Sequence, residues 1–227
     1  MNRPLRVLEL YSGTQSIGKE FRKKGHIVLS VDINPLFTTE LFGNLEQWTI
    51  SVADVTAEEV YRRLGGKPDV IWASPLCTTH SVASIGRHRH KTKEGWLIPK
   101  SELAKEHDVL MSATLKLINQ IEPDLWFIEN PRAGMRKAEM MQPLNPFRHT
   151  VTYCQYGDTR MKPTDIWTNH PEPRFKPPCN NGDSCHVSAP RGSQVGTQGM
   201  KNAILKAVIP PKLCEHIVQI TEERLCA

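Results

Sequence analysis

Residues 6–32 read RVLELYSGTQSIGKEFRKKGHIVLSVD and hold two apolar runs around a glycine-containing turn. The runs Arg6–Leu10 and Ile27–Val31 have the length and composition of buried strands, and the residues between them show helical spacing up to Lys24. Gly25 ends that helix. A strand, a helix and a second strand in this order give two parallel strands joined by a right-handed crossover. The stretch therefore predicts an α/β fold built on a parallel sheet.

The remainder of the chain continues this alternation. The predicted strands are Trp48–Val52, Asp69–Ala73, Asp124–Ile128 and an antiparallel or hairpin element, Phe147–Tyr156; the predicted helices are Leu36–Phe42, Ala57–Leu64, Ser101–Ile121 and Asn202–Leu225. Pro163–Gly199 is rich in Pro, Gly, Asn, Ser and Thr and lacks periodicity, which indicates a long loop or a minimal subdomain. We expect residues 1–162 and 200–227 to form the main domain and residues 163–199 a small irregular region.

Composition narrows the class of protein. A chain of 227 residues is long enough to bury one full core. No apolar stretch approaches membrane-spanning length, and the N-terminus leads into a strand rather than a signal peptide. Six scattered cysteines fit a reducing compartment, so we expect a cytoplasmic location. The net charge of +5 favours a polyanionic partner.

The first turn has the composition of a ligand site without the pattern of a phosphate site. Tyr11 and Ser16 stand where a dinucleotide-binding turn needs glycine, and the Gly-Lys-Ser/Thr of a phosphate loop is absent from the sequence. Asp32 ends the second strand, where a carboxylate accepts hydrogen bonds from ribose hydroxyls. Asp54 ends the third strand, in a suitable place for an adenine amino group. Two acids beside this turn favour a neutral or cationic adenosyl ligand; the alternative for Asp32 is a simple strand-end cap.

Cys77 lies just after the apolar run Val70–Ala73, at the carboxyl end of the fourth predicted strand. Ligands and catalytic groups gather at such strand ends in open α/β sheets. A thiol there is suited to nucleophilic chemistry if its neighbours take its proton or stabilise the thiolate. A buried structural cysteine is the alternative at this stage.

Together, several stretches resemble the DNA (cytosine-5) methyltransferase family. They are ELYSGTQSIG (9–18), SPLCTTHS (74–81), ENP (129–131), QYGDTRMK (155–162) and VIPPKLCEHI (208–217). The resemblance implies a Rossmann-like, S-adenosylmethionine-dependent methyltransferase sheet, in a compact phage or bacterial type whose target-recognition region is reduced to residues 163–199. It covers residues 3–162 and 200–220.

The resemblance also implies the chemistry. Cys77 would attack the ring carbon next to carbon 5 of a flipped cytosine, and Glu129 would hydrogen-bond the protonated ring nitrogen and exocyclic amine. Arg160 would contact the base carbonyl and steady its loop, and Lys162 stands where the family has a second arginine. The cofactor would be S-adenosylmethionine and the partner double-stranded DNA. Its expected cofactor-binding residues are Tyr11, Ser12, Gly13, Thr14, Gln15, Ser16, Asp32, Ile33, Asp54, Val55 and Pro75. The residues expected to bind DNA are Ser81, Arg87, Arg89, Lys91, Asn130 and Arg191. Residues 87–93 would form a mobile basic loop that closes on the nucleic acid. The alternative for this stretch is a run of charged residues that is simply solvated.

Some positions depart from the family pattern. Leu76 replaces a proline before Cys77, His80 replaces the usual phenylalanine, Pro131 replaces a valine and Gln15 replaces a glycine. Cys77, Glu129 and Arg160 are all present, which favours an active enzyme. Two other functions stay open: the same chemistry on RNA or a free cytosine nucleotide, and a catalytically silent nucleic-acid-binding relative.

Cys179, Cys185 and His186 cluster in the irregular region. Thiolates and imidazole are zinc ligands, and Cys154, His170 or Cys214 could supply a fourth. The spacing differs from the usual Cys-x-x-Cys pair, so the favoured interpretation is ordinary loop residues without a metal.

Overall fold

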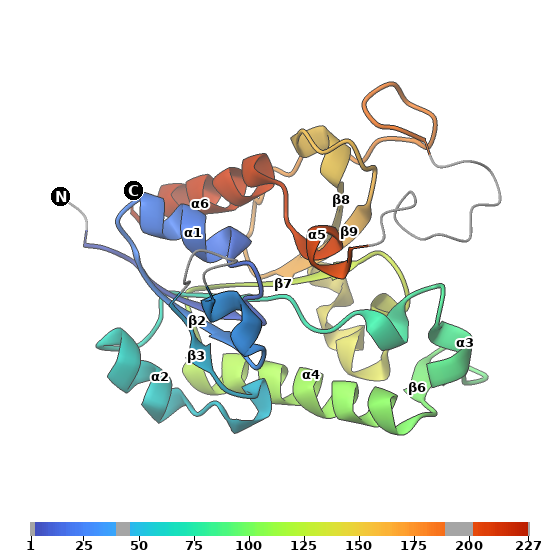
Figure 1. Ribbon diagram of the computed structural model, residues 1–227, viewed down its shortest axis with the longest axis horizontal. Helices are drawn as coiled ribbons and strands as arrows, with labels where there is room; N and C mark the ends of the chain where they lie inside the picture. Colours follow the sequence, from blue (N-terminus) through green and yellow to red (C-terminus); the bar gives the residue numbers. More distant parts are fainter. Residues whose placement is uncertain (1–2, 40–45, 189–201, 227) are drawn as a thin grey trace.

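A seven-stranded sheet runs through the molecule (Figure 1). The computed structural model describes residues 3–39, 46–188 and 202–226. The strands of the sheet are β1 (Arg6–Leu10), β2 (Ile27–Asp32), β3 (Trp48–Thr49), β4 (Val70–Ala73), β7 (Leu125–Pro131), β8 (Arg148–Thr152) and β9 (Pro163–Thr168). Their order is β3-β2-β1-β4-β7-β9-β8. The first five in this order are mutually parallel, β9 is antiparallel to β7, and β8 is antiparallel to β9. The predicted α/β fold is confirmed.

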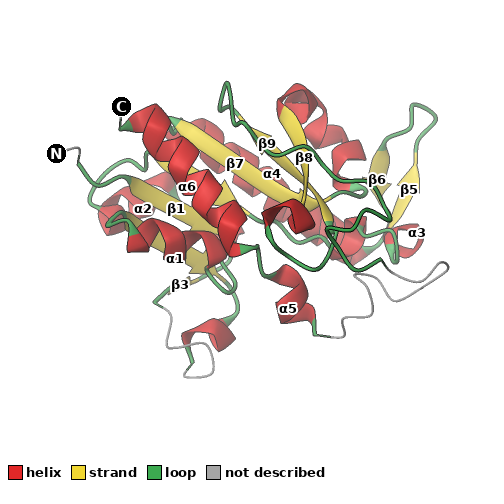
Figure 2. Ribbon diagram, turned by 90° about the horizontal axis from the view of Figure 1, so that it is seen from above, coloured by secondary structure: helices red, strands yellow, loops and turns green. Residues whose placement is uncertain are grey.

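Helices cover both faces of the sheet (Figures 1 and 2). Helices α1 (Ser16–Lys23) and α6 (Pro211–Leu225) lie on one face, and α2 (Ala57–Leu64) and α4 (Glu102–Ile121) lie on the other. Three shorter elements complete the fold: α3 (Ile85–His88), the hairpin of β5 (Arg89–Lys91) and β6 (Leu97–Pro99), and α5 (Ala203–Ala207). No helix within the described ranges is both long enough and apolar enough to cross a bilayer.

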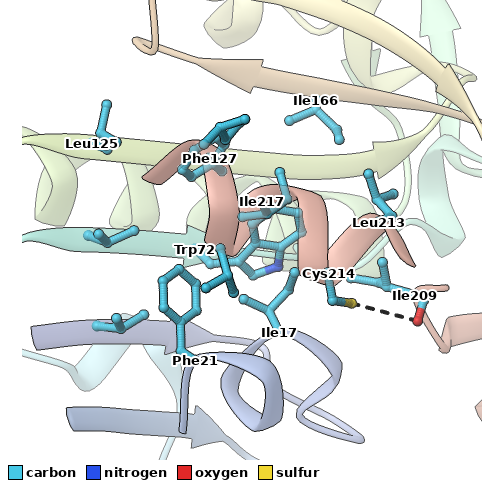
Figure 3. Packing of buried hydrophobic residues seen from close by; sticks show 14 of the residues in the cluster. Ile17, Phe21, Trp72, Leu125, Phe127, Ile166, Ile209, Leu213, Cys214 and Ile217 are labelled. Atoms are coloured by element: carbon cyan, nitrogen blue, oxygen red, sulfur yellow. Dashed lines mark hydrogen bonds between the residues drawn. The ribbon is translucent and has the colours of Figure 1, made fainter. Parts of the chain in front are cut away.

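The core under α1 and α6 joins the two ends of the chain. Phe21 of α1 and Ile217 of α6 pack against the sheet residues Trp72 and Phe127, all fully or almost fully buried (Figure 3). Burying side chains of this size contributes roughly 1.5–3 kcal/mol each. This packing holds α6 beside β1 and β4, whose carboxyl ends carry the candidate site.

Side-chain caps start the helices of the other face. The Thr56 hydroxyl accepts a hydrogen bond from the Glu59 amide at the start of α2, and Ser101 caps α4 through the Ala104 amide. Such caps stabilise a helix by about 1 kcal/mol. Gly65 ends α2 with φ +69°, a conformation that glycine adopts without steric strain.

Four secondary-structure expectations need correction. Pro163–Thr168, expected in a loop, is β9 and lies inside the sheet between β7 and β8. Its buried Asp165 is paired with Arg136, which allows a charged residue at an interior position. The third strand covers Trp48–Thr49 alone and a 3-10 turn follows, while the helix expected from Leu36 is a 3-10 turn over Pro35–Thr38. Residues 40–42 of that expected helix lie outside the described residues. The expected loop after Ser81 contains α3 and the β5–β6 hairpin.

Candidate active site

The carboxyl ends of β4 and β7 bring Cys77 and Glu129 to neighbouring positions. These strands pair in parallel with Ala73 opposite Ile128, so the turn that carries Cys77 begins beside Glu129. The Asn130 side-chain amide donates a hydrogen bond to the Pro75 carbonyl over 2.9 Å and ties the turn to β7. Because Asn130 is buried and its amide serves this contact, the structure gives it a positioning role and not an open face toward DNA.

Electrostatic interactions link the Cys77 thiol with Glu129 and Lys162. Burial raises the pKa of Cys77, the Glu129 charge raises it further, and Lys162 lowers it. Burial also raises the pKa of Glu129, against the opposing influence of Lys162 and of hydrogen bonds from Tyr153 and Ser74. The pKa of Lys162 is lowered by burial, while Glu129 and Cys77 act to raise it. A thiol, a carboxyl group and an amine therefore influence one another at the end of the sheet.

The Lys162 ammonium is held in place by two contacts. It donates a hydrogen bond to the Lys206 carbonyl over 2.8 Å and lies 4.5 Å from the centroid of the Tyr153 ring. The Lys162 backbone has φ +25°, an unusual value for a residue with a side chain. The Tyr153 hydroxyl in turn donates to Glu129 over 3.1 Å.

Arg160 has a different environment from the one expected. Its guanidinium pairs with Asp158 and donates to the Leu205 carbonyl over 3.1 Å, so it connects the loop after β8 to α5. The side chain is buried in these protein contacts. This arrangement fits the expected steadying of the loop. Of the two cations, Lys162 is the one whose charge acts on the pKa values of both Cys77 and Glu129.

The first turn adopts the tight geometry expected for a ligand loop. Tyr11, Gly13 and Gln15 have φ of 55°, 47° and 54°, in the left-handed region. Gln15 stands where the family has glycine, and its buried side chain is fixed by a hydrogen bond to the Glu46 carbonyl. The Gly13 amide donates to an Asp32 carboxylate oxygen over 2.8 Å. The turn and the end of β2 therefore form one unit.

The other expected cofactor residues lie around this unit. Thr14 and Ser16 exchange a hydrogen bond between their hydroxyls at 3.1 Å. Ile33 is 68% exposed, Asp54 is exposed, and Val55 and Pro75 are buried. Ile33 follows β2, Asp54 and Val55 lie at the end of the 3-10 turn after β3, and Pro75 follows β4. The strand ends therefore bring these segments to one edge of the sheet. A separate cavity of about 340 Å³ lies between residues 53–57 and α4; Val55 is the one expected cofactor residue in its lining.

The basic stretch after Cys77 is partly structural. Arg89 was expected at the DNA, but its side chain is fully buried and pairs with Asp108 at 2.7 Å and with the Thr79 hydroxyl at 2.9 Å. That expectation is corrected, because a buried guanidinium holding α4 against the Cys77 turn is not available to phosphate. Arg87 and Lys91 are exposed on α3 and the hairpin, and Ser81 is half-buried. Arg191 lies outside the described residues.

Three contributors to the site were missed by sequence reasoning. Tyr153 holds Glu129 and Lys162, Asp158 pairs with Arg160, and Ser74 hydrogen-bonds Glu129 and accepts from the Trp72 indole over 2.9 Å. Asp158 lies two residues before Arg160, a spacing that could have suggested the pair. Nothing in the local sequence of Tyr153 indicates its contact with a residue 24 positions earlier.

Cys179, Cys185 and His186, for which ordinary loop residues were the favoured interpretation and zinc the alternative, gather around Cys154 in a cluster of their own. The other two candidates for a fourth ligand are engaged elsewhere. His170 contacts the Ile220 carbonyl, and the Cys214 thiol donates to the Ile209 carbonyl (Figure 3).

No family model matches the chain, and no curated protein sequence matches it. Solved structures do match. An E. coli protein assigned as a DNA modification methyltransferase encoded within a prophage is 14% identical and superposes with a TM-score of 0.52, over 72% of this chain and 46% of its own. The Entamoeba histolytica methyltransferase EhMeth is 12% identical with a TM-score of 0.51, over 74% of this chain and 53% of its own. The chain has a methyltransferase fold. It spans about half the length of these two structures.

Proposed function

We propose that this protein transfers a methyl group from S-adenosylmethionine to carbon 5 of cytosine in DNA, through a covalent bond between Cys77 and a flipped base. It would belong to the compact phage or bacterial type of the DNA (cytosine-5) methyltransferases. One observation carries the proposal: Cys77 follows β4 beside Glu129 of the parallel neighbour β7, and the charge of Lys162, just before the antiparallel β9, acts on both groups.

The cofactor edge fits S-adenosylmethionine. The Ser12 hydroxyl is buried and has no hydrogen-bond partner among the described residues, so a polar group of a ligand would satisfy it. Asp32 accepts hydrogen bonds from the Gly13 and Asn34 amides and keeps acceptor capacity for ribose hydroxyls. A β-carbon on Gly13 would meet only the Phe37 ring, at 3.8 Å, so the backbone there is open to close approach. When bound, the cofactor supplies a methyl group on a positively charged sulfur.

Cys77 provides the nucleophile in this proposal. Because burial raises its pKa, the resting thiol is protonated, and it must pass that proton to solvent water before its sulfur bonds to ring carbon 6. The attack places electron density on carbon 5, which otherwise is a poor nucleophile. After carbon 5 has gained the methyl group, it would give its own proton to a water molecule acting as base. The electron pair of that C–H bond would then re-form the ring double bond, and the Cys77 sulfur would leave as thiolate.

Glu129 and Lys162 stabilise the charge that develops on the base. The raised pKa of Glu129 lets its carboxyl group carry a proton toward the ring nitrogen, and its position beside Cys77 matches the two sides of one pyrimidine. The charge of Lys162 acts on both groups, and its ammonium is suited to donate a hydrogen bond to the carbonyl oxygen of the base. A lysine is a point charge where the family has the planar fork of arginine, so it makes one strong contact in place of two parallel ones.

The exposed cations of α3 and the hairpin support a nucleic-acid substrate. Arg87 and Lys91 lie in the elements that come next along the chain after the Cys77 turn and are exposed to solvent, where phosphate contacts form. An enzyme acting on a base must take it out of the stack or bind it single-stranded. We place the residues that follow β9, up to 199, in target recognition; Pro163–Thr168, which the sequence placed in this region, belong to the sheet.

A covalent trap tests the proposal directly. The full chain is incubated with S-adenosylmethionine and a DNA duplex, an RNA strand or a cytosine nucleotide, each carrying 5-fluorocytosine, whose fluorine blocks the final elimination. We expect a denaturation-resistant adduct on DNA that disappears in Cys77→Ala and persists in Cys226→Ser. An adduct that survives Cys77→Ala refutes the nucleophile. Trapping on RNA or nucleotide alone moves the same chemistry to that substrate, and tight DNA binding without any adduct or methyl transfer identifies a silent binding protein.

A further inference from the structure

The Pro- and Gly-rich region meets the end of β8 at a cluster of four potential metal ligands. Among the described residues, the Cys154, Cys179 and Cys185 sulfurs and the His186 imidazole place one ligand atom each within 4.8 Å of all the others. Cys154 and Cys179 are buried, His186 is half-buried and Cys185 is exposed. Cys179, Cys185 and His186 are close in the sequence, and the fold brings in Cys154 from 25 positions before Cys179.

We propose that this cluster is a structural zinc site with three thiolate ligands and one imidazole ligand. Zinc binds such sets tetrahedrally, with bonds of about 2.3 Å to sulfur and 2.0–2.1 Å to nitrogen. In that geometry neighbouring ligand atoms lie roughly 3.5–3.8 Å apart, from the same bond lengths. The Cys154–Cys185 distance is 3.6 Å, and the His186 Nδ1 atom lies 3.6 Å from the Cys179 sulfur and 3.5 Å from the Cys185 sulfur.

One pair of sulfurs distinguishes zinc from a disulfide. The Cys154 and Cys179 sulfurs are 3.0 Å apart, well beyond the bond of about 2.05 Å in a disulfide. They need to move apart by less than 1 Å to fit a zinc tetrahedron. A disulfide between them would use two ligands and leave Cys185 and His186 without a role in the cluster.

Groups around the cluster support negative sulfurs. The Gln155 side-chain amide donates toward the Cys185 sulfur over 3.7 Å, a contact that stabilises a thiolate. The Gly182 amide contacts His186 Nε2 at a long 3.4 Å. When zinc is bound to Nδ1, the imidazole carries its proton on Nε2. Two N–H donors cannot hydrogen-bond to each other, so Nε2 would donate to water in place of this weak contact.

The site explains how an irregular segment is held on the domain. Residues 169–188 contain no helix or strand, and a segment of this length cannot bury a core of its own. The Cys179 amide donates to the Thr152 hydroxyl over 3.0 Å, and the Val187 amide donates to the Thr159 carbonyl over 2.9 Å. A metal between these two hydrogen bonds would clamp the segment onto the turn that leads to Arg160.

Metal content provides the first test. The full chain, purified under reducing conditions with zinc in the medium, should contain about one zinc per chain, because a four-ligand structural site is normally fully occupied. Cys154→Ser, Cys179→Ser, Cys185→Ser and His186→Gln should each lose most of it. Cys226→Ser and His90→Gln, which remove a thiol and an imidazole outside the cluster, should keep it. Zinc retained in a Cys154→Ser/Cys179→Ser double variant overturns the proposal.

Two measurements on the unmodified chain avoid variants that fail to fold. Replacement of zinc by Co²⁺ should give the intense visible bands of tetrahedral cobalt with thiolate charge-transfer bands. Thiol titration of the denatured, chelator-treated but unreduced chain should find all six cysteines free. A result of four free thiols shows that two cysteines form a disulfide, and it refutes the zinc site. The absence of a cobalt spectrum also refutes the zinc site.

Discussion

The Tyr153 hydroxyl donates a hydrogen bond to Glu129 over 3.1 Å, while the face of the same ring lies 4.5 Å from the Lys162 ammonium. One fully buried side chain thus orients both the acidic and the basic partner of Cys77. Tyr153 comes from the turn after β8 and Glu129 from β7, so the relationship exists only because β9 and β8 close the sheet on this side.

Tyr153→Phe should slow formation of the 5-fluorocytosine adduct by roughly 10-fold or more, since hydrogen bonds to charged groups contribute about 1.5–3 kcal/mol. The ring and its contact with Lys162 remain, so the variant should still fold, with a lower thermal unfolding temperature because a buried hydrogen bond is lost. Tyr156→Phe is the matched control, because that hydroxyl accepts from the Lys176 amide and does not contact Glu129. Equal adduct rates in the two variants would show that the Tyr153 hydroxyl plays no part in positioning Glu129.

Lys162→Met should shift the pH dependence of adduct formation to higher pH. Burial raises the pKa of the Cys77 thiol, and Lys162 opposes that rise, so the rate increases with pH as thiolate forms. Loss of the ammonium removes the opposing charge, and a displacement of about one pH unit is expected for an interaction of this kind. Lys162→Arg retains a positive charge, so the pH dependence of its adduct formation should be closer to that of the unmodified protein. The measurement is the rate of adduct formation in a single turnover, between neutral and alkaline pH. Identical pH profiles for Lys162→Met and Lys162→Arg would contradict the expected shift.

His80→Phe should abolish part of the acid sensitivity of the fold. Burial, assisted by the charges of Arg89 and His107, lowers the pKa of His80 from 6.5 to about 3. Below pH 6.5 His80 becomes protonated in the unfolded chain but stays neutral in the folded chain. The free energy of unfolding therefore falls as the pH falls toward 3. The slope from one such group is about 1.4 kcal/mol per pH unit.

Phenylalanine has no ring nitrogens, and both nitrogens of His80 lack hydrogen-bond partners among the described residues. His80→Phe should therefore be more stable than the unmodified chain at pH 5 and show a shallower loss between pH 6.5 and 4, measured by urea unfolding. The exposed His90→Gln is the control and should keep the original slope. An unchanged slope in His80→Phe would mean that His80 is accessible to protons in the folded protein.

Gly18→Ala should destabilise the fold by about 1–3 kcal/mol, the usual effect of overpacking. A β-carbon at Gly18 would lie 2.4 Å from the buried Glu9 carboxylate, which accepts hydrogen bonds from the Gly18 amide and the Ser30 hydroxyl. Gly86→Ala in α3 is the matched change, because its β-carbon meets nothing within 4 Å. Chemical denaturation of both variants checks the difference; similar stabilities would show that Glu9 has room to move.

The sequence alone determined the features that depend on local periodicity. Residues 6–32 specify a strand, a helix and a parallel strand, and the ends of later strands place Cys77 and Glu129 at one edge of the sheet. These predictions succeed because apolar spacing fixes which face of an element is buried, and because parallel strands bring their carboxyl ends together.

Only the tertiary structure decided which distant side chains pair. Pro163–Thr168 looks like a loop in sequence, yet it pairs with β7 and β8 as an interior strand, and Arg136 neutralises its buried Asp165. Arg89 looks like a cation for DNA, yet Asp108 on α4 removes it from solvent. Cys154 and Cys179 are 25 positions apart in the sequence, and the fold alone brings their sulfurs together. Such partners contribute no local pattern, because their interaction energy exists only once the chain has folded and excluded water from between them.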